Sequence, residues 1–592
     1  MVRQLARCGV RHVVICPGSR STPLVLAVAS EPGMRPLLHV DERAAGYFAL
    51  GIARQSGRPV AVVSTSGTAA ANLLPAAVEA SLSRVPLLLL TADRPPELRG
   101  VGAPQAIDQL RLFGEHARWS AEAPCAPAEG EAPEALLAHA RQLGARAVEA
   151  AAGPPAGSVH LNLPFREPLV AADGDPERLA AAAAEAVTLL PPPARAPLLP
   201  PSGEIQALAA ESAGRRGVLV CGPASPELPV AAIVRLAAAL GWPVLADALS
   251  GLRRASADDG VIWTYDAILR EPSTAERLAP EIVIRFGAQP TSKPLATWLA
   301  RLHRGGALRE YVVDEADGWR DPSASAAQLR SEPGAFADAL AAASGGAPSG
   351  DGGWLACWRE ADAIAGEALD AGLAAIDARG EPFEGLAAQV LAEALPEGGT
   401  LVCGNSMPVR DVDGFVPALG RRLRIVGTRG ASGIDGVAST AAGAALAAAE
   451  RSEGPVGLLV GDLSFLHDLT GLWAVGRHDL SLAVVLLHND GGGIFHFLPQ
   501  REALPGLFEP WFGTPAGLDA ARAAALFGGR HAALPPRAAE MREAVAAAVG
   551  SPGLSVLELR THRDRNVELH RELWAGVAAS LRAARVGAAT GR

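Results

Sequence analysis

The feature that most constrains the fold is an apolar run that ends at a carboxylate, with an asparagine 27 residues further on at the end of a second apolar run. The first run, residues 456–460, stops at Gly461-Asp462, and the second, residues 482–487, leads to Asn489. A helical stretch at 465–475 lies between them. This order predicts one strand–helix–strand unit, in which two parallel strands end at the same edge of a sheet. The carboxylate and the amide oxygen are therefore expected at that edge.

These side chains suit a hard divalent cation. Mg²⁺ takes few protein oxygens, and water and phosphate oxygens complete its octahedron. The glycines Gly491 and Gly492 would let the backbone approach a diphosphate closely. An ordinary polar loop explains Gly461-Asp462 alone equally well. The asparagine at this spacing, with glycines directly behind it, favours a site for a cation and a diphosphate.

Length and composition indicate a large globular protein. The chain has 592 residues, 49% hydrophobic and 20% charged, and its length predicts roughly three or four domains. A net charge of −10 argues against nucleic acid as the main partner. The six cysteines form no CxxC pair, so we expect buried thiols and no disulfide or zinc site. Without a membrane-length apolar run or a signal peptide, we expect a cytoplasmic protein with no membrane partner.

Strand and helix signals alternate in three blocks, which predicts an α/β fold of parallel sheets with helices on both faces. Pro-rich 191–201 and Gly-rich 345–353 are interpreted as linkers, so the predicted domains are 1–188, 203–345 and 354–592. The first and third blocks share a layout, and the middle sheet is expected to be smaller. Predicted strands are 13–16, 37–40, 60–64, 87–91 and 159–163; then 217–220, 244–246, 282–286 and 311–313; then 401–403, 423–426, 456–460, 482–487 and 554–557.

Glu42 is a second candidate for chemistry. It follows a predicted strand and opens an amphipathic helix, where an acid commonly serves only the helix dipole, worth about 0.3–1 kcal/mol. For Glu42 alone the two roles are equally acceptable. With three α/β blocks and the cation and diphosphate motif in the third, the chain resembles the thiamine-diphosphate decarboxylases. The resemblance implies that Glu42 hydrogen-bonds the cofactor's aminopyrimidine ring, whose amino group can then take the proton from the thiazolium carbon.

Further motifs make the resemblance more specific. They are Cys16-Pro17-Gly18-Ser19-Arg20-Ser21-Thr22-Pro23, Thr65-Ser66-Gly67-Thr68-Ala69, Asp93-Arg94-Pro95-Pro96-Glu97-Leu98, Gln105-Ala106-Ile107, Gly404-Asn405-Ser406 with Arg410, and Arg429-Gly430-Ala431-Ser432-Gly433-Ile434-Asp435-Gly436. Over essentially the whole chain, and most weakly in the middle block, they resemble the 2-succinyl-5-enolpyruvyl-6-hydroxy-3-cyclohexene-1-carboxylate synthases.

That resemblance implies a reaction and its partners. 2-Oxoglutarate would be decarboxylated, and the resulting succinyl carbanion equivalent would add to isochorismate by conjugate addition. The products would be 2-succinyl-5-enolpyruvyl-6-hydroxy-3-cyclohexene-1-carboxylate and CO₂, in menaquinone biosynthesis. The implied cofactors are thiamine diphosphate and Mg²⁺ or Mn²⁺. The implied assembly is a homodimer, or a dimer of dimers, with the active site at the interface.

Matching motif positions implies the roles of individual residues. Cofactor contacts would come from Glu42, Thr68, Ser406, Ile434, Gly461, Asp462, Leu463, Ser464, Asn489, Gly491, Gly492 and Ile494, with Asp462, Asn489 and Gly491 on the metal. Ser406 and Arg410 would hold the oxoglutarate-derived carboxylate. Ser19, Arg20, Arg94, Gln105, Lys293 and Arg429 would line the isochorismate side. Ile434 would bend the cofactor, and Ile494, Phe495 and Leu498 would form an apolar wall. Several arginines suit two highly anionic substrates, because a guanidinium binds a carboxylate with two hydrogen bonds.

Lys293 is the only lysine among the 53 Lys and Arg residues. A lone lysine favours a position that needs a compact ammonium over chance retention on a surface helix. Pro294 follows it where some relatives carry a second cation, so we expect less positive charge there. His488 and Asp490 flank Asn489 where relatives show asparagines, but the spacing of Asn489 is kept. The chain begins shortly before its first predicted strand, so we expect the natural start codon to lie upstream.

Three other functions remain possible at the level of sequence. An acetolactate-synthase-type carboligase would need a pocket for FAD or a small keto acid, and the many substrate-facing cations count against it. A non-enzymatic cofactor-binding relative would be expected to lack Glu42 or Asp462. A nicotinamide dehydrogenase would need a GxGxxG turn after a strand with an acid further on, and no strand here has one.

Overall fold

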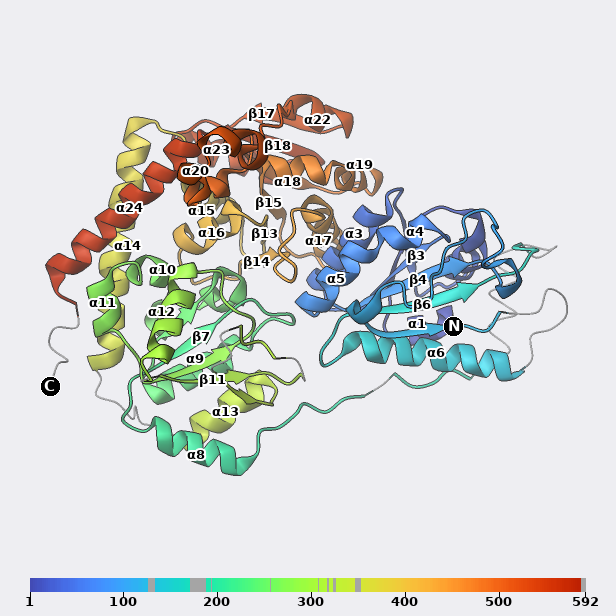
Figure 1. Ribbon diagram of the computed structural model, residues 1–592, viewed down its shortest axis with the longest axis horizontal. Helices are drawn as coiled ribbons and strands as arrows, with labels where there is room; N and C mark the ends of the chain where they lie inside the picture. Colours follow the sequence, from blue (N-terminus) through green and yellow to red (C-terminus); the bar gives the residue numbers. More distant parts are fainter. Residues whose placement is uncertain are drawn as a thin grey trace.

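The computed structural model describes residues 1–125, 134–170, 188–192, 194–255, 257–306, 308–316, 319–322, 326–345 and 353–586. Within them the chain forms three parallel sheets of six strands each, flanked by helices (Figure 1). This confirms the predicted α/β class. The middle sheet also has six strands, so the prediction that it is smaller was wrong in strand number.

The elements of the first sheet and its helices are α1 (Val2–Arg7), β1 (His12–Ile15), α2 (Thr22–Ala29), β2 (Arg35–Leu38), α3 (Glu42–Ser56), β3 (Val60–Ser64), α4 (Thr68–Asn72), α5 (Leu74–Ser83), β4 (Leu87–Asp93), β5 (Ala117–Glu122), α6 (Glu134–Ala152) and β6 (Ser158–Pro164). The middle domain has α8 (Ser202–Ser212), β7 (Gly217–Cys221), α9 (Val230–Leu240), β8 (Val244–Ala246), β9 (Val261–Ile262), α10 (Tyr265–Ile268), α11 (Pro272–Arg277), β10 (Ile282–Phe286), α12 (Lys293–Arg304), β11 (Arg309–Val313), β12 (Ala327–Leu329) and α13 (Pro333–Ala343).

The third domain has α14 (Gly353–Arg379), α15 (Glu384–Ala394), β13 (Thr400–Cys403), α16 (Met407–Phe415), β14 (Arg424–Gly427), α17 (Val437–Glu450), β15 (Val456–Gly461), α18 (Asp462–His467), α19 (Trp473–Arg477), β16 (Leu482–His488), α20 (Gln500–Ala503), α21 (Pro505–Phe508), α22 (Ala520–Leu526), β17 (Arg530–Ala533), α23 (Ala538–Val549), β18 (Leu554–Arg560) and α24 (Arg563–Ala584). The helical stretch predicted at 465–475 is present as short pieces, α18, the 3-10 turn Leu469–Leu472 and α19.

The first and third sheets have the same strand order, β2-β1-β3-β4-β6-β5 and β14-β13-β15-β16-β18-β17. Their predicted similarity is therefore confirmed. The middle sheet runs β9-β8-β7-β10-β11-β12, which is the order of dinucleotide-binding sheets. Strand order alone does not establish a ligand, because unrelated functions share such sheets.

Every predicted strand is present and begins within two residues of its predicted start. β5, β9, β12 and β17 were not predicted, and each of them is an edge strand. The described part of the linker at 191–201 has neither helix nor strand, as predicted, whereas 346–352 lies outside the described residues.

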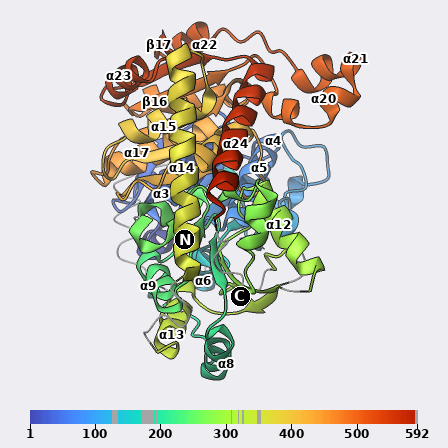
Figure 2. The same cartoon turned by 90° about the vertical axis from the view of Figure 1, so that its left-hand side faces the viewer.

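The proposed domain boundary at 354 falls inside a helix that serves two domains. α14 packs beside α24 along one side of the molecule (Figure 2). Its first turn also reaches the middle sheet, where Trp354 Nε1 donates to the Gly217 carbonyl at 2.8 Å. The long helix therefore ties the middle and third domains into one hydrophobic core.

The first and third domains meet through α3 and α17. A Cβ on Gly51 would lie 2.1 Å from the Thr440 carbonyl oxygen, and one on Gly443 would lie 2.0 Å from the Phe48 carbonyl oxygen. Glycine at both positions is therefore what allows the two helices to come so close. Residues of both sheets share one core across this contact, which fixes the two sheets relative to each other.

Two further expectations concern composition. No helix in the described residues is long and apolar enough to cross a bilayer. All six cysteines lie in the described residues and none is in a disulfide; Cys16, Cys221 and Cys403 are buried, whereas the others are partly exposed. The prediction of buried thiols therefore holds for half of them.

Candidate active site

Predicted site residues follow four neighbouring strands of the third sheet. Ser406 follows β13, Ile434 lies in the loop after β14, Asp462 follows β15 and Asn489 follows β16. Because these strands are parallel and adjacent, their carboxyl ends form one row, where α/β sheets place ligands. The strand–helix–strand unit deduced from residues 456–489 is thus present.

Asp462 is fixed at this edge by two backbone donors. The residue is 1% exposed. Oδ1 accepts from the Leu463 N–H at 2.7 Å, and Oδ2 accepts from the Gly491 N–H at 3.0 Å. Burial raises the pKa of this carboxyl, and the hydrogen bond from Gly491 opposes the rise. The carboxylate therefore joins the loops after β15 and β16.

Asn489 lies beside it with its amide held at one end only. Its Nδ2 donates to Glu384 Oε1 at 3.0 Å, while Oδ1 is buried without a hydrogen-bond partner among the described residues. An unpaired buried carbonyl oxygen costs about 1–3 kcal/mol, so it fits a ligand atom for a cation. Asp462, Asn489 Oδ1 and the Gly491 carbonyl are hard oxygen donors of the kind that Mg²⁺ takes.

This donor set is small. The described residues contain no group of three His, Cys, Asp or Glu side chains placed to hold a metal. An ion held by Asp462 and Asn489 would take its remaining ligands from water and phosphate oxygens. Gly491 has φ +146°, and a Cβ there would lie 1.9 Å from the Gly513 carbonyl oxygen. Only glycine fits here, because the following segment packs directly against the Gly491 backbone.

The loop after β14 carries Ile434, which is 43% exposed. Ser464 Oγ donates to the Ile434 carbonyl at 2.7 Å, and Tyr47 of α3 donates to Asp435 Oδ2 at 2.6 Å. Asn405 Nδ2 donates to the Gly433 carbonyl at 2.7 Å. An apolar side chain is thus presented by a loop held from three sides, which suits its predicted role against a cofactor.

Four residues of this framework were missed as site residues: Tyr47, Glu79, Glu384 and Asn405. Glu79 is 1% exposed and accepts from the Gly430 and Ala431 N–H groups at 3.0 and 2.7 Å, next to Arg429. Asn405 belongs to the Gly404-Asn405-Ser406 motif, so its place near the site could have been predicted from the sequence. Tyr47 and the two glutamates lie within helices, and the sequence gives no sign of their distant partners.

A cavity of about 650 Å³ opens between the middle and third domains. Lys293 and Arg410 line it together with Ile494 and Leu498. Arg410 donates to the Ser406 carbonyl, and Ser406 has φ +70°, a backbone conformation that costs non-glycine residues about 1–3 kcal/mol and concentrates at functional sites. The structure therefore brings the predicted lysine of the middle domain to the predicted residues of the third.

Two more predicted cations, Arg20 and Arg94, lie at the carboxyl edge of the first sheet, whereas Arg429 follows β14 of the third sheet and donates to Asn405 Oδ1 at 3.1 Å. Arg20, 7% exposed, donates to the Phe165 carbonyl at 3.0 Å, and Arg94 donates to Ser66 Oγ at 3.1 Å. Burial and the nearby Arg20 charge lower the pKa of Arg94. Ser19, Thr68 and Gln105 are exposed at the same edge. The first domain thus gathers its own set of predicted substrate contacts.

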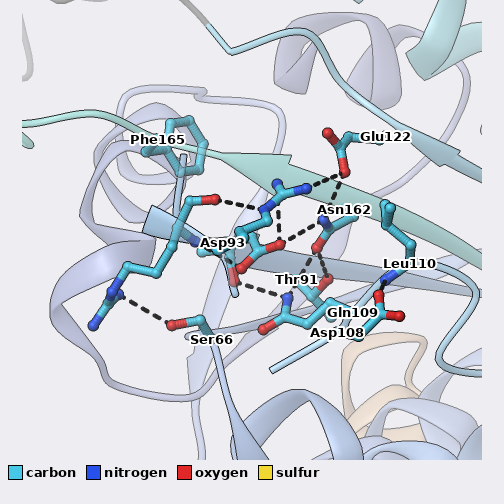
Figure 3. A network of polar contacts seen from close by, with 12 residues as sticks. Ser66, Thr91, Asp93, Asp108, Gln109, Leu110, Glu122, Asn162 and Phe165 are labelled. Atoms are coloured by element: carbon cyan, nitrogen blue, oxygen red, sulfur yellow. Dashed lines mark hydrogen bonds and ion pairs between the residues drawn. The ribbon is translucent and has the colours of Figure 1, made fainter. Parts of the chain in front are cut away.

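Gln109 belongs to a buried network of polar contacts with Thr91, Asp93 and Asn162 (Figure 3). It accepts from the Gly67 N–H at 2.8 Å and donates to Asn162 Oδ1 at 2.9 Å. Asn162 in turn donates to Asp93 Oδ2 at 2.8 Å. The turn that carries Ser66 and Thr68 is therefore tied to the strand end that carries Arg94.

Glu42 is half-buried at the start of α3, and burial together with the Asp41 charge raises its pKa. Its neighbours contact the third domain: Thr470 donates to Asp41 Oδ2 at 2.7 Å, and Arg43 donates to the His467 carbonyl at 2.7 Å. Among the described residues no hydrogen bond or ion pair joins Glu42 to Asp462 or Asn489. One chain therefore presents two sets of predicted residues, and the structure leaves Glu42 outside the third-domain set.

Comparison with known proteins assigns the chain to a family. Three family patterns match in order: "Thiamine pyrophosphate enzyme, N-terminal TPP binding domain" at 1–112, "Middle domain of thiamine pyrophosphate" at 205–362, and "Thiamine pyrophosphate enzyme, C-terminal TPP binding domain" at 421–559. The 2-succinyl-5-enolpyruvyl-6-hydroxy-3-cyclohexene-1-carboxylate synthase of Geobacillus kaustophilus is 47% identical over 98% of this chain and 97% of its own. The synthase of Chloroflexus aurantiacus is 45% identical over 97% and 94%. The chain belongs to this synthase family.

The fold of the synthase has wider relatives. The thiamine diphosphate-dependent 4-hydroxybenzoylformate decarboxylase of Rhodococcus jostii RHA1 has a TM-score of 0.67 at 18% identity, covering 95% of this chain and 98% of its own. Benzoylformate decarboxylase from Polynucleobacter necessarius has a TM-score of 0.66 at 16% identity, over 95% and 97%. These likenesses concern the fold alone. The predicted resemblance is confirmed, the synthase is a thiamine-diphosphate enzyme, and the acetolactate-synthase-type alternative is not favoured.

Proposed function

We propose that the synthase decarboxylates 2-oxoglutarate and transfers the succinyl unit to isochorismate, giving 2-succinyl-5-enolpyruvyl-6-hydroxy-3-cyclohexene-1-carboxylate and CO₂ for menaquinone biosynthesis. The observation that carries the proposal is the state of its predicted substrate cations. Four of the five, Lys293, Arg94, Arg410 and Arg429, form no ion pair with any described residue, whereas the fifth, Arg20, pairs with Glu167 at 3.2 Å. Cations left without carboxylates are what two polycarboxylate substrates require.

For the metal, Asp462, Asn489 and the Gly491 carbonyl would hold Mg²⁺ or Mn²⁺, and the glycines after Asn489 would approach the diphosphate. When bound, thiamine diphosphate supplies a nucleophilic carbon for the keto group and an electron sink while CO₂ leaves. Glu42, with its raised pKa, would hold a proton on the aminopyrimidine side. Leu463 and Ser464 would line the diphosphate, and Ile434 would support the bend of the cofactor.

The substrates would lie on either side of the reacting carbon. Ser406 and Arg410 would bind the oxoglutarate-derived carboxylate, with Ile494, Phe495 and Leu498 as the apolar wall. Ser19, Arg20, Arg94, Gln105, Lys293 and Arg429 would bind isochorismate, so that the β-carbon of its unsaturated acid faces the new nucleophile. Thr68 would lie beside that centre. Fixed orientation of both partners would supply much of the rate acceleration.

We infer further that a second copy of the chain completes the site, as a homodimer or a dimer of dimers. Large apolar side chains are exposed beside both sets of predicted residues: Val40 and Val101 on the first domain are 55% and 69% exposed, and Leu507 and Trp511 on the third are 56% and 74% exposed. Such exposure is typical of surfaces that become covered. A two-fold dimer would bring the first-domain set of one chain to the third-domain set of the other.

The deciding experiment mixes the protein with thiamine diphosphate, Mg²⁺, isochorismate and 2-oxoglutarate, and identifies the product by mass spectrometry. Formation of the succinyl adduct with 2-oxoglutarate, and none with pyruvate as donor, is expected. Turnover of pyruvate in preference to 2-oxoglutarate would contradict the proposal. A cytoplasmic location stays a prediction, which cell fractionation would test.

A further inference from the structure

A buried glutamate lies directly behind the predicted metal ligand Asn489. Glu384 is the first residue of α15 and is 1% exposed. Its Oε1 accepts from Asn489 Nδ2 at 3.0 Å and from Thr561 Oγ1 at 2.7 Å. No motif in the sequence pointed to it, since 105 residues separate it from Asn489.

The chemistry of the pair determines which end of the amide faces the cation. A primary amide has a donating end and an accepting end, and Glu384 Oε1 accepts from both Asn489 Nδ2 and Thr561 Oγ1, so this oxygen carries no proton. Glu384 therefore holds the NH₂ end of Asn489 and turns Oδ1 away. Turning the amide over would place Oδ1 against the carboxylate and lose the hydrogen bond. Oδ1 is the buried atom left without a partner among the described residues.

The surroundings leave the amide little room for another arrangement. A Cβ on Gly493 would lie 2.8 Å from Asn489 Nδ2, so backbone of the following turn packs closely against the amide. Thr561 Oγ1 donates to the same oxygen of Glu384, Oε1, and has no hydrogen bond to Asn489. The orientation of Asn489 is thus set by one carboxylate within a packed site.

We propose that Glu384 is the positioning residue of the divalent-cation site: it orients the Asn489 amide so that Oδ1 faces the ion. The inference rests on the proposed function, which makes Asn489 a ligand. Glu384 touches neither substrate nor ion and acts through the asparagine. Groups that orient a ligand in this way typically change metal affinity by ~10–100-fold when they are replaced.

The test measures Mn²⁺ affinity of the full-length protein by electron paramagnetic resonance, with thiamine diphosphate present. Glu384→Gln keeps the shape but can present either amide end, so Asn489 is no longer fixed. We expect Mn²⁺ to bind ~10–100-fold more weakly. Thr561→Val is the matched control, because it removes the other hydrogen bond to the same oxygen, and its affinity should stay within about threefold of wild type.

A double variant shows whether Glu384 acts by orienting Asn489 or by a general disturbance of the site. If Glu384 acts through Asn489, the variant that combines Glu384→Gln with Asn489→Ala should bind Mn²⁺ as weakly as Asn489→Ala alone. Circular dichroism and the melting temperature check that each variant folds. If Glu384→Gln does not fold, Glu384→Asp replaces it: its carboxylate is one methylene too short to reach Asn489 Nδ2, and the same loss relative to Thr561→Val is expected.

The outcomes distinguish a failure of the positioning role from a failure of the proposed metal site on which it rests. Wild-type affinity in Glu384→Gln, or an equal loss in Thr561→Val, overturns the positioning role if Asp462→Ala and Asn489→Ala still weaken Mn²⁺ binding. A further loss in the double variant beyond Asn489→Ala also overturns it. If neither Asp462→Ala nor Asn489→Ala weakens binding, the metal site of the proposed function is itself wrong.

Discussion

A substitution of Gln109 tests whether the first domain holds the residues predicted to bind isochorismate in position. The side chain is 1% exposed and contacts the Gly67 N–H, the Ala92 carbonyl at 3.2 Å and Asn162 Oδ1 (Figure 3). Gln109→Leu keeps a similar volume but leaves the buried Gly67 N–H without its partner. One orphaned donor costs about 1–3 kcal/mol. The Ala92 carbonyl also loses its hydrogen bond from Gln109, whereas Asn162 Oδ1 keeps the one from Thr91. We expect a destabilisation of about 2–4 kcal/mol.

The substitution should lower the use of isochorismate but not that of 2-oxoglutarate. Gly67 lies between Ser66, the partner of Arg94, and Thr68, and a Cβ on it would be 3.4 Å from the Gln105 carbonyl oxygen. Releasing this turn displaces Arg94 and Gln105 relative to each other. A displacement of about 1 Å can cost ~10²-fold, so kcat/KM for isochorismate should fall by ~10- to 100-fold. Single-turnover CO₂ release from 2-oxoglutarate should stay within about threefold of wild type.

The same substitution at an exposed position supplies the control. Gln206→Leu on α8 should change the unfolding free energy by less than about 0.5 kcal/mol and leave both half-reactions intact. Equal losses of CO₂ release and isochorismate capture in Gln109→Leu would refute a specific role of Gln109 in isochorismate binding. Unchanged kinetics in a destabilised variant would make the network purely structural.

Three other predictions concern the proposed site. Glu42→Gln should fold and bind thiamine diphosphate, but kcat should fall by at least ~10²–10⁴-fold; activity within about threefold of wild type would remove Glu42 from the mechanism. Mixed and reassembled Glu42→Gln and Asp462→Ala subunits should regain up to about a quarter of wild-type turnover, since half of random dimers carry one intact site; no recovery in mixed dimers would mean a site within one chain. Lys293→Arg should raise the KM for isochorismate and lower kcat/KM by about 10- to 150-fold, because the planar guanidinium misplaces the charge. Unchanged kinetics would mean that Lys293 does not contact a substrate.

How far the sequence predicted the site depends on how local its signals are. Asp462 and Asn489 each end an apolar strand, so their shared edge followed from residues close in the chain. β5 and β17 were missed because edge strands expose polar residues such as Arg118 and Arg530. Glu79 and Glu384 could not be found, because a buried acid is defined by partners that only the folded chain brings near. The shared sheet edge of Asp462 and Asn489 was thus predictable from local signals, whereas the distant hydrogen-bond partners of these loops were not.

A final prediction concerns acid and the same first-domain network. His160 is 1% exposed on β6, and its Nε2 lies 2.8 Å from Thr91 Oγ1, which donates to Asn162 Oδ1 at 3.1 Å. Burial lowers the pKa of His160 from 6.5 to about 4. The unfolded chain therefore takes up a proton between pH 6.5 and 4 that the folded chain does not, and stability present above pH 6.5 is lost as the pH falls. From pH 7 to pH 5 this amounts to about 2 kcal/mol.

His160→Gln should remove that share of the acid sensitivity while keeping a polar group near Thr91. The measurement is hydrogen exchange of β4 and β6 peptides at pH 7 and pH 5, corrected for the intrinsic exchange rates. Wild-type protection should fall by about 2 kcal/mol more than that of the variant. His39, whose pKa burial also lowers to about 4, remains in both proteins and cancels in the comparison. An identical pH dependence in the two proteins would show that His160 is not the buried group that titrates.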